Sequence, residues 1–131
     1  MKKDRILNPE LISAIASIGH TEYFVIADAG LPIPQGIKVI DLTLTRGIPG
    51  FIQTLKAISE ELVVESYIIA GELPDNNPGV YEETRNVLSG LPAKVVAHEQ
   101  LKELLLKAKA VCRTGETTPY SNVILVAGVN F

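Results

Sequence analysis

Residues 19–34, GHTEYFVIADAGLPIP, contain the pattern that decides the fold. An uninterrupted apolar run, 24–27, follows His20 and ends at Asp28. Apolar runs without polar alternation are typical of strands that are buried on both faces of a parallel sheet. Similar runs recur as YIIA at 67–70 and as VILVAGV at 123–129. The sequence therefore predicts at least three central strands.

Helical patterns separate the predicted strands. The segment 8–19 has Asn8 as N-cap, Pro9 at the first helical position and Gly19 at its end. Apolar residues at helical spacing predict further helices at 47–62, 80–90 and 99–110, with strands at 37–44, 93–98 and 110–115 and a loop at 74–79. Alternating strands and helices predict an α/β fold: one layered domain, residues 1–131, with a largely parallel central sheet flanked by helices.

Composition narrows the class of protein. Of the 131 residues, 47% are hydrophobic, mostly aliphatic, which predicts a dense core with apolar surface left over and hence a homo-oligomer. A net charge of −3 without a basic run argues against nucleic acid as a partner. The apolar runs are shorter than the roughly 20 residues that a membrane span needs. The single Cys112 and the lack of a signal-peptide pattern favour the cytoplasm.

Motifs for bound cofactors do not occur in the sequence. There is no phosphate-binding P-loop, no dinucleotide-binding glycine pattern and no nucleophile elbow. A site of two histidines and one carboxylate, from His20, His98 and Asp28, stays open as an alternative. We expect no cofactor and chemistry by proton transfer.

Three residues are candidates for such chemistry. His20 is either a cation at a helix end or a general acid or base, since imidazole titrates near neutral pH. Asp28 either caps its own loop or orients an imidazole and accepts bonds from ligand hydroxyls. His98, at a strand end and helix start, is either a cap or a site residue. Asp28 and His98 lie where doubly wound sheets bind ligands, beyond the carboxyl ends of strands.

The loop 117–122, TTPYSN, is a dense set of neutral hydrogen-bonding groups. One interpretation is turn chemistry around Pro119. The other is a polyol site, in which Tyr120, Ser121 and Asn122 offer the mixture of donors and acceptors that sugar hydroxyls need.

Four segments together resemble the D-ribose pyranase family, whose sister branch is the L-fucose mutarotases. They are LNPELISAIASIGHTEYFVIADAGLPIP at 7–34, IDLTLTRGIPGF at 40–51, VVAHEQLKELL at 95–105 and RTGETTPYSNVILVAGV at 113–129. The resemblance covers essentially the whole chain.

The resemblance implies an activity and a set of site residues. It implies interconversion of the pyranose and furanose rings of free D-ribose, without a cofactor, by ring-shaped homo-oligomers, often decamers, with sites near subunit boundaries. It places the acid/base histidine at His20 and sugar binding at Asp28, at His98 and at the run Tyr120, Ser121 and Asn122. The alternatives are mutarotation of another sugar such as L-fucose and a non-catalytic ribose-binding accessory protein.

These residues combine into one structural hypothesis. His20 and Asp28 bracket a buried strand, which we expect to fix both side chains at one pocket. The loop around Tyr120 would form the other wall of that pocket. His20 would then handle the proton of the ring oxygen while the loop and His98 hold the hydroxyls.

Overall fold

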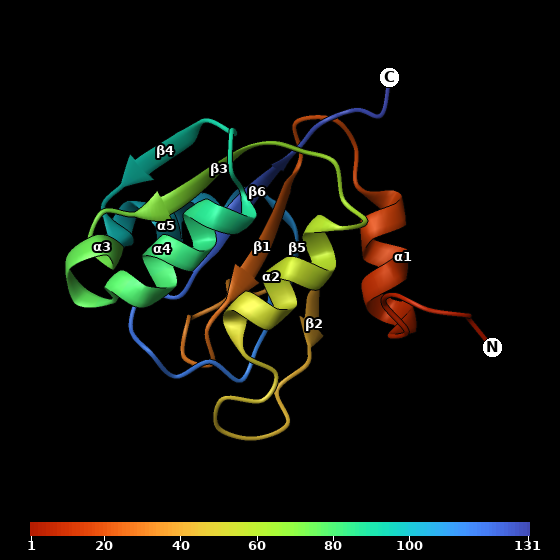
Figure 1. Cartoon of the computed structure of the whole chain (residues 1–131), viewed down its shortest axis with the longest axis horizontal. Coiled ribbons are helices and arrows are strands. Elements are labelled where there is room, and N and C mark those ends of the chain that lie inside the picture. Colours follow the sequence, from red (N-terminus) through yellow and green to blue (C-terminus); the bar gives the residue numbers. More distant parts are fainter.

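A six-stranded sheet forms the centre of the protein, in a computed structural model that describes residues 1–131 (Figure 1). Its spatial order is β2-β5-β1-β6-β3-β4. The strands are β1 (Tyr23–Ala27), β2 (Val39–Asp41), β3 (Val64–Ala70), β4 (Ala93–Val96), β5 (Ala108–Arg113) and β6 (Val123–Ala127). Neighbours pair in parallel except at β6, which runs antiparallel to both β1 and β3. The predicted α/β class with a largely parallel sheet is confirmed.

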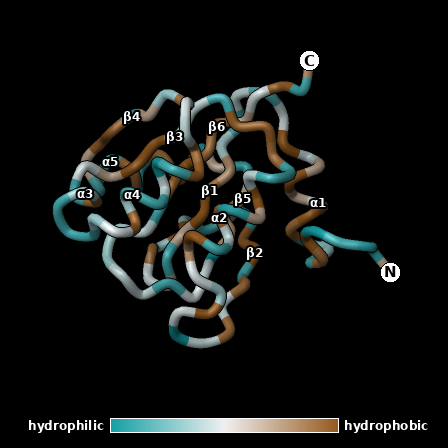
Figure 2. The backbone as a smooth tube through the Cα atoms, in the orientation of Figure 1, coloured by the Kyte–Doolittle hydropathy of each residue, from teal (hydrophilic) through white to brown (hydrophobic).

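Helices cover both faces of this sheet. They are α1 (Pro9–Ser17), α2 (Phe51–Ser59), α3 (Leu73–Asn76), α4 (Pro78–Val87) and α5 (His98–Leu104), which continues into a 3₁₀ turn at Leu105–Lys107. The larger core of 20 buried residues joins α1 and α2 to one face, and a second core of 11 joins α5 to the other. Figure 2 shows hydrophobic colour along the central strands and hydrophilic colour at α3. None of the helices is long and apolar enough to cross a bilayer.

The start of the first helix follows its predicted chemistry. The Asn8 side chain accepts a hydrogen bond from the Leu11 N–H at 2.9 Å, and Pro9 occupies the first turn, where its missing N–H costs nothing. The helix then buries Leu11, Ala14 and Ile15 against the sheet. This capped helix is one of the elements that sequence pattern alone places correctly.

Two predicted segments have a different secondary structure from the one predicted. The segment 74–79, predicted as a loop, contains the short helix α3 and the first turn of α4, each with a proline in its first turn. The helix predicted over 99–110 ends at Leu104, and Ala108–Arg113 forms β5 instead. Strand β5 is held between β1 and β2, so sheet pairing overrides the helical propensity of its alanine and lysine residues.

Cys112 illustrates how completely the sheet is enclosed. Its side chain is fully buried, and burial raises the pKa of the thiol to about 12. We expect a thiol reagent such as Ellman's reagent to leave the folded protein unmodified at pH 8 and to label one thiol per chain after unfolding in urea. Rapid labelling without denaturant would contradict this packing.

Candidate active site

A pocket of about 540 Å³ opens at the edge of the sheet where the parallel strands end. Asp28 follows β1, His98 follows β4 and Glu116 follows β5, and all three residues line it with Thr118 and Tyr120. The antiparallel β6 starts at this same edge, so the loop 114–122 that enters it supplies one wall. The volume of the pocket is within the usual range for small-molecule sites, about 300–1,000 Å³. Asp28 and His98, which the sequence placed beyond the carboxyl ends of strands, therefore both line a pocket at that edge.

The Asp28 carboxylate is held by two donors. Its Oδ1 accepts the Gly30 N–H at 2.9 Å, and its Oδ2 accepts the Asn122 side-chain amide at 3.0 Å. The amide oxygen of Asn122 in turn accepts the Asp28 backbone N–H at 2.8 Å. One asparagine therefore fixes both the backbone and the side chain of Asp28, which leaves the remaining lone pairs of the carboxylate to a ligand.

Ser121 and Asn122 are fully buried, and neither lines the pocket. The Ser121 hydroxyl lies 2.9 Å from the Thr118 hydroxyl and accepts a bond from the Asn77 amide at 3.1 Å. The structure therefore brings the predicted pair next to the pocket, with side chains that hold the loop together. Tyr120 lies in the left-handed region at φ 58°, a conformation that turns the chain sharply at this point.

His98 and Tyr120 pack against each other at the pocket. Their ring centroids are 5.1 Å apart and the planes are at 82°, an edge-to-face arrangement. The His98 backbone N–H donates to both oxygens of Glu72 at 3.1 Å, which anchors the start of α5 to the end of β3. The Nδ1 atom of His98 is buried without a partner. Lys102, one turn further along α5, pairs with Glu99 at 2.7 Å.

Glu116 was not predicted as a site residue. Its Oε1 accepts the Phe51 N–H at the start of α2, and its Oε2 accepts the hydroxyl and N–H of Thr118. Partial burial raises the pKa of this carboxyl, but the bonds from Phe51 and Thr118 outweigh burial and lower the pKa overall. Glu116 therefore joins the pocket loop to a helix as an ionised group. Its position directly after the strand predicted at 110–115 is the signal that could have identified it.

This bonding predicts a pH-dependent contribution to stability. Because the pKa of Glu116 is lower in the folded than in the unfolded chain, its contribution is present above about pH 4.3 and is lost as the pH falls through the folded value. We expect Glu116→Gln to lower the free energy of unfolding at pH 7 and to differ progressively less from the wild type below pH 4. Urea unfolding at pH 7 and pH 3.5 measures both values. An equal difference at the two pH values would contradict this role.

His20 lies at the other end of the sheet. It precedes β1, whereas Asp28 follows it, and the five residues of β1 alone span about 16 Å. The His20 imidazole is half exposed and its Nε2 lies 2.9 Å from Glu65 Oε2. It lines a separate cavity of about 280 Å³ with Leu62 and Phe131.

The prediction that β1 fixes His20 and Asp28 at one pocket is therefore wrong for a single chain. An extended strand separates the residues at its two ends. Two residues that flank a strand in the sequence therefore lie far apart in space. For the same reason one chain does not bring His20 to His98 and Asp28, as the two-histidine, one-carboxylate alternative requires.

Comparison with known proteins places this geometry in a family. The model of the RbsD / FucU transport protein family matches residues 1–130. The D-ribose pyranase of Geobacillus thermodenitrificans is 52% identical over 131 residues, which are 100% of this chain and 99% of that protein.

Solved structures agree with this match. The structure of Bacillus subtilis RbsD complexed with D-ribose has a TM-score of 0.96 and 46% identity and covers 100% of both chains. The fucose mutarotase of Streptococcus pneumoniae in complex with L-fucose shares the fold, with a TM-score of 0.82 and 24% identity over 95% of each chain. This chain belongs to the RbsD / FucU transport protein family.

Proposed function

We propose that the protein interconverts the pyranose and furanose forms of free D-ribose, without a cofactor, as a D-ribose pyranase. One observation carries the proposal: the pocket lined by Asp28, His98 and Tyr120 lies in a chain that is 46% identical, over its full length, to an RbsD protein solved with D-ribose. Relatives named D-ribose pyranase are about as similar, at 52% and 50% identity. We propose that residues 1–131 act as a single mutarotase domain.

Ring opening and ring closure each need two proton transfers, and neither changes an oxidation state. An acid gives a proton to the ring oxygen while a base takes the proton of the anomeric hydroxyl, so the C1–ring-oxygen bond breaks and an aldehyde forms. The open chain rotates, and a different hydroxyl closes on C1 with the proton transfers reversed. We assign the ring-oxygen proton to His20 and sugar binding to Asp28, His98 and Tyr120, with Ser121 and Asn122 shaping the binding loop.

This assignment requires two copies of the chain. His20 and Asp28 lie at opposite ends of β1, so His20 reaches the pocket only from a neighbouring copy. A contact that joins one end of a subunit to the opposite end of the next is heterologous, and such contacts form a ring when the rotation between neighbours closes. We therefore propose a ring-shaped homo-oligomer, for which the family resemblance suggests a decamer, and we propose the cytoplasm as its location, where the lone Cys112 stays reduced.

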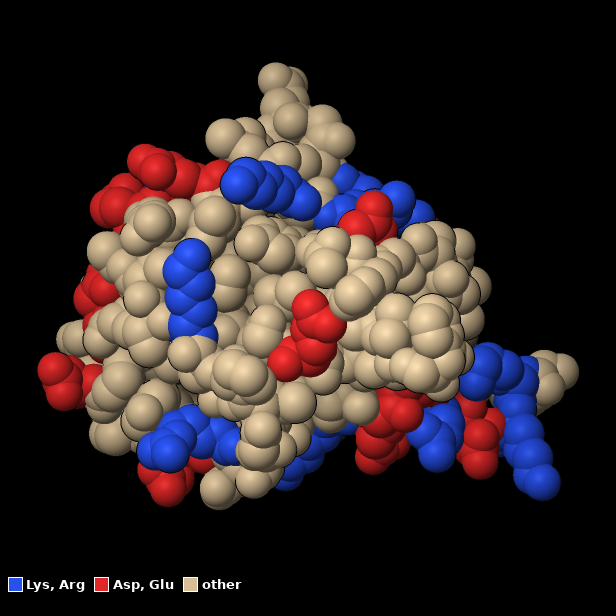
Figure 3. Space-filling view, turned by 90° about the horizontal axis from the view of Figure 1, so that it is seen from above, with Lys and Arg blue, Asp and Glu red and all other residues tan.

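Surface composition supports such a contact. Exposed apolar residues occur at both ends of the molecule: Phe131 beside the His20 cavity, and Leu44 and Ile48 in the loop that packs on Gly115 near the pocket. Figure 3, seen from above relative to Figure 1, shows a surface mostly of uncharged residues, with a few acidic and basic side chains within it and more along its edges. Apolar surface of this kind is typical of faces that bind another protein.

Saturation transfer between the pyranose and furanose NMR signals of D-ribose tests the activity directly. We expect exchange with the protein to exceed exchange in buffer by orders of magnitude, and L-fucose to respond much less. If the protein accelerates the exchange of L-fucose alone, then L-fucose rather than D-ribose is the substrate. If the protein accelerates the exchange of neither sugar, the enzyme hypothesis is rejected and the alternative of a sugar-binding protein is favoured. Light scattering checks the assembly, with about 142 kDa expected for ten chains of 14.2 kDa.

A further inference from the structure

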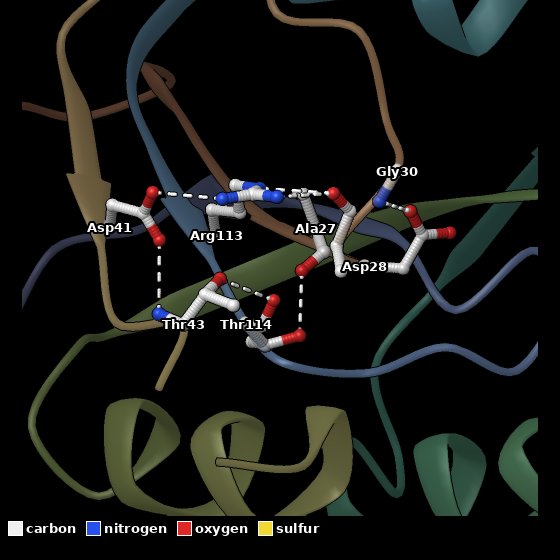
Figure 4. A network of polar contacts seen from close by, with 8 residues as sticks. Ala27, Asp28, Gly30, Asp41, Thr43, Arg113 and Thr114 are labelled. Carbon is white, nitrogen blue, oxygen red and sulfur yellow. Dashed lines mark hydrogen bonds and ion pairs between the residues drawn. The ribbon is translucent and has the colours of Figure 1, made fainter. Parts of the chain in front are cut away.

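Arg113 ends strand β5 directly behind the pocket wall without lining the pocket. Its guanidinium donates two hydrogen bonds to the Ala29 carbonyl, from Nε at 3.0 Å and from a terminal nitrogen at 2.7 Å. The other terminal nitrogen pairs with Asp41 Oδ2 at 2.9 Å. Figure 4 shows Arg113 between Asp41 on one side and the Asp28 loop on the other. Arg113 is therefore the link between strand β2 and the residues that follow β1.

The two ends of one peptide group connect Arg113 to Asp28. The Ala29 carbonyl and the Gly30 N–H belong to the same planar unit, in which C=O and N–H point in opposite directions. Arg113 binds the carbonyl, and the Gly30 N–H donates to Asp28 Oδ1 at 2.9 Å. The direction in which Arg113 holds this carbonyl therefore decides where the N–H points. A cation on the carbonyl oxygen also polarises the peptide and strengthens its N–H as a donor.

The rest of this turn is bonded so that only this peptide depends on Arg113. The Ala29 N–H donates to the Glu116 carbonyl at 2.8 Å, and the Asp28 N–H donates to the Asn122 amide oxygen. Thr114 fixes the residue before them, since its hydroxyl and its N–H both donate to the Ala27 carbonyl. The Ala29–Gly30 peptide has no other partner on its carbonyl side.

We propose that Arg113 is a positioning residue of the sugar site, which aims and holds the Asp28 carboxylate through the Ala29–Gly30 peptide. The inference rests on the proposed function for its kinetic readout. Arginine suits this task because its planar fork makes two bonds to one carbonyl and a third to Asp41 at fixed angles, whereas a lysine ammonium is a point charge on a flexible stem. The pair with Asp41 is partly exposed, so we expect it to contribute little to the orientation of the guanidinium beside the two bonds to Ala29.

The first test compares Arg113→Met with Asp41→Asn by D-ribose exchange. Misplacing a site group by about 1 Å costs up to about 100-fold in rate, so we expect Arg113→Met to slow exchange by about 10- to 100-fold. Asp41→Asn keeps both bonds to Ala29 and is the matched control, with a rate within about twofold of the wild type. An equal loss in the two variants would overturn the proposal, because the network as a whole would then be what matters.

A double-mutant cycle separates positioning from general destabilisation. If Arg113 acts through Asp28, then adding Arg113→Met to Asp28→Asn costs nothing beyond Asp28→Asn alone. Losses that multiply would show an independent role and overturn the proposal.

A milder variant and an NMR signal test the proposal if Arg113→Met does not fold or if the protein does not turn over ribose. Arg113→Lys retains the charge but has a single donor nitrogen in place of the planar fork, and we expect exchange about 3- to 10-fold slower than the wild type. The amide proton of Gly30 should shift upfield in Arg113→Lys, as its bond to Asp28 weakens, and stay in place in Asp41→Asn. An unchanged Gly30 signal in Arg113→Lys would refute the positioning role. An inactive wild type with a shifted Gly30 signal would refute only the proposed function.

Discussion

Replacing His20 with alanine is expected to slow pyranose–furanose exchange of D-ribose by about 100- to 10,000-fold, the usual contribution of a general acid or base. The expected reason is loss of the proton donor to the ring oxygen. His20 caps no helix with its side chain, and its imidazole is half exposed, so its removal should leave the fold intact. NMR saturation transfer gives the rate, and circular dichroism reports the fold.

Two variants control for the surroundings of His20. Glu65→Gln removes the carboxylate that lies 2.9 Å from the imidazole in one chain and should slow exchange far less than His20→Ala. His98→Ala removes the histidine that lines the pocket. Wild-type exchange in His20→Ala together with loss in His98→Ala would move the acid/base role to His98 and reject the assignment made here.

The same variant tests whether the site spans two copies. His20→Ala and Asp28→Asn chains are co-expressed in equal amounts and assemble into mixed oligomers. A site is intact only when its histidine comes from an Asp28→Asn chain and its aspartate from a neighbouring His20→Ala chain. Random assembly of heterologous contacts gives about one quarter intact sites, so about one quarter of the wild-type rate should return. No recovery in verified mixed oligomers would contradict a site shared between copies.

Gly115→Ala is expected to destabilise the protein by about 3 kcal/mol, which corresponds to a fall of roughly 10 °C in Tm. A Cβ at this position would lie 2.5 Å from the carbonyl oxygens of Thr45 and Ile48 and 2.7 Å from the Ile48 nitrogen. These are backbone atoms, held there by hydrogen bonds between Gly47 and Gly115 and between Gly115 and Pro49. The loop 43–50 must therefore move away, and with it the start of α2. Thermal unfolding measures the change.

Gly79→Ala is the matched control for this substitution. A Cβ at Gly79 meets nothing within 4 Å, and the residue lies in the first turn of α4. Alanine there should leave Tm unchanged or raise it slightly, since it reduces the freedom of the unfolded chain. A large loss in Gly79→Ala, or none in Gly115→Ala, would show that close backbone approach is not what requires glycine at 115.

The fold could be predicted from local pattern where one signal dominated. Asn8 and Pro9 define the start of α1, and apolar runs define β1, β3 and β6. The pattern failed at 108–110, where alanine and lysine read as helix but pairing with β1 makes a strand. It also did not reveal that β6 runs antiparallel, because strand direction depends on partners distant in sequence.

The candidate site could likewise be predicted only where a local pattern was sufficient. Asp28 and His98 were placed at the pocket because carboxyl ends of parallel strands meet at one edge, and Tyr120 because of the polar loop 117–122. His20 was placed in the wrong pocket for one chain because sequence proximity to Asp28 conceals the length of a strand. The contacts of Glu116 with α2 and of Arg113 with Ala29 join residues 65 and 84 positions apart, which no local pattern encodes.

The central position of β6 has a consequence for protein synthesis. Residues 123–127 are the last of the six strands to leave the ribosome, yet they sit between β1 and β3. Until they emerge, the nascent chain has two separate sheet fragments, β2-β5-β1 and β3-β4, and each presents an open edge to other chains. Completion of the sheet therefore waits for the end of this segment's translation, and a stop codon before residue 123 would release an aggregation-prone product rather than a smaller enzyme.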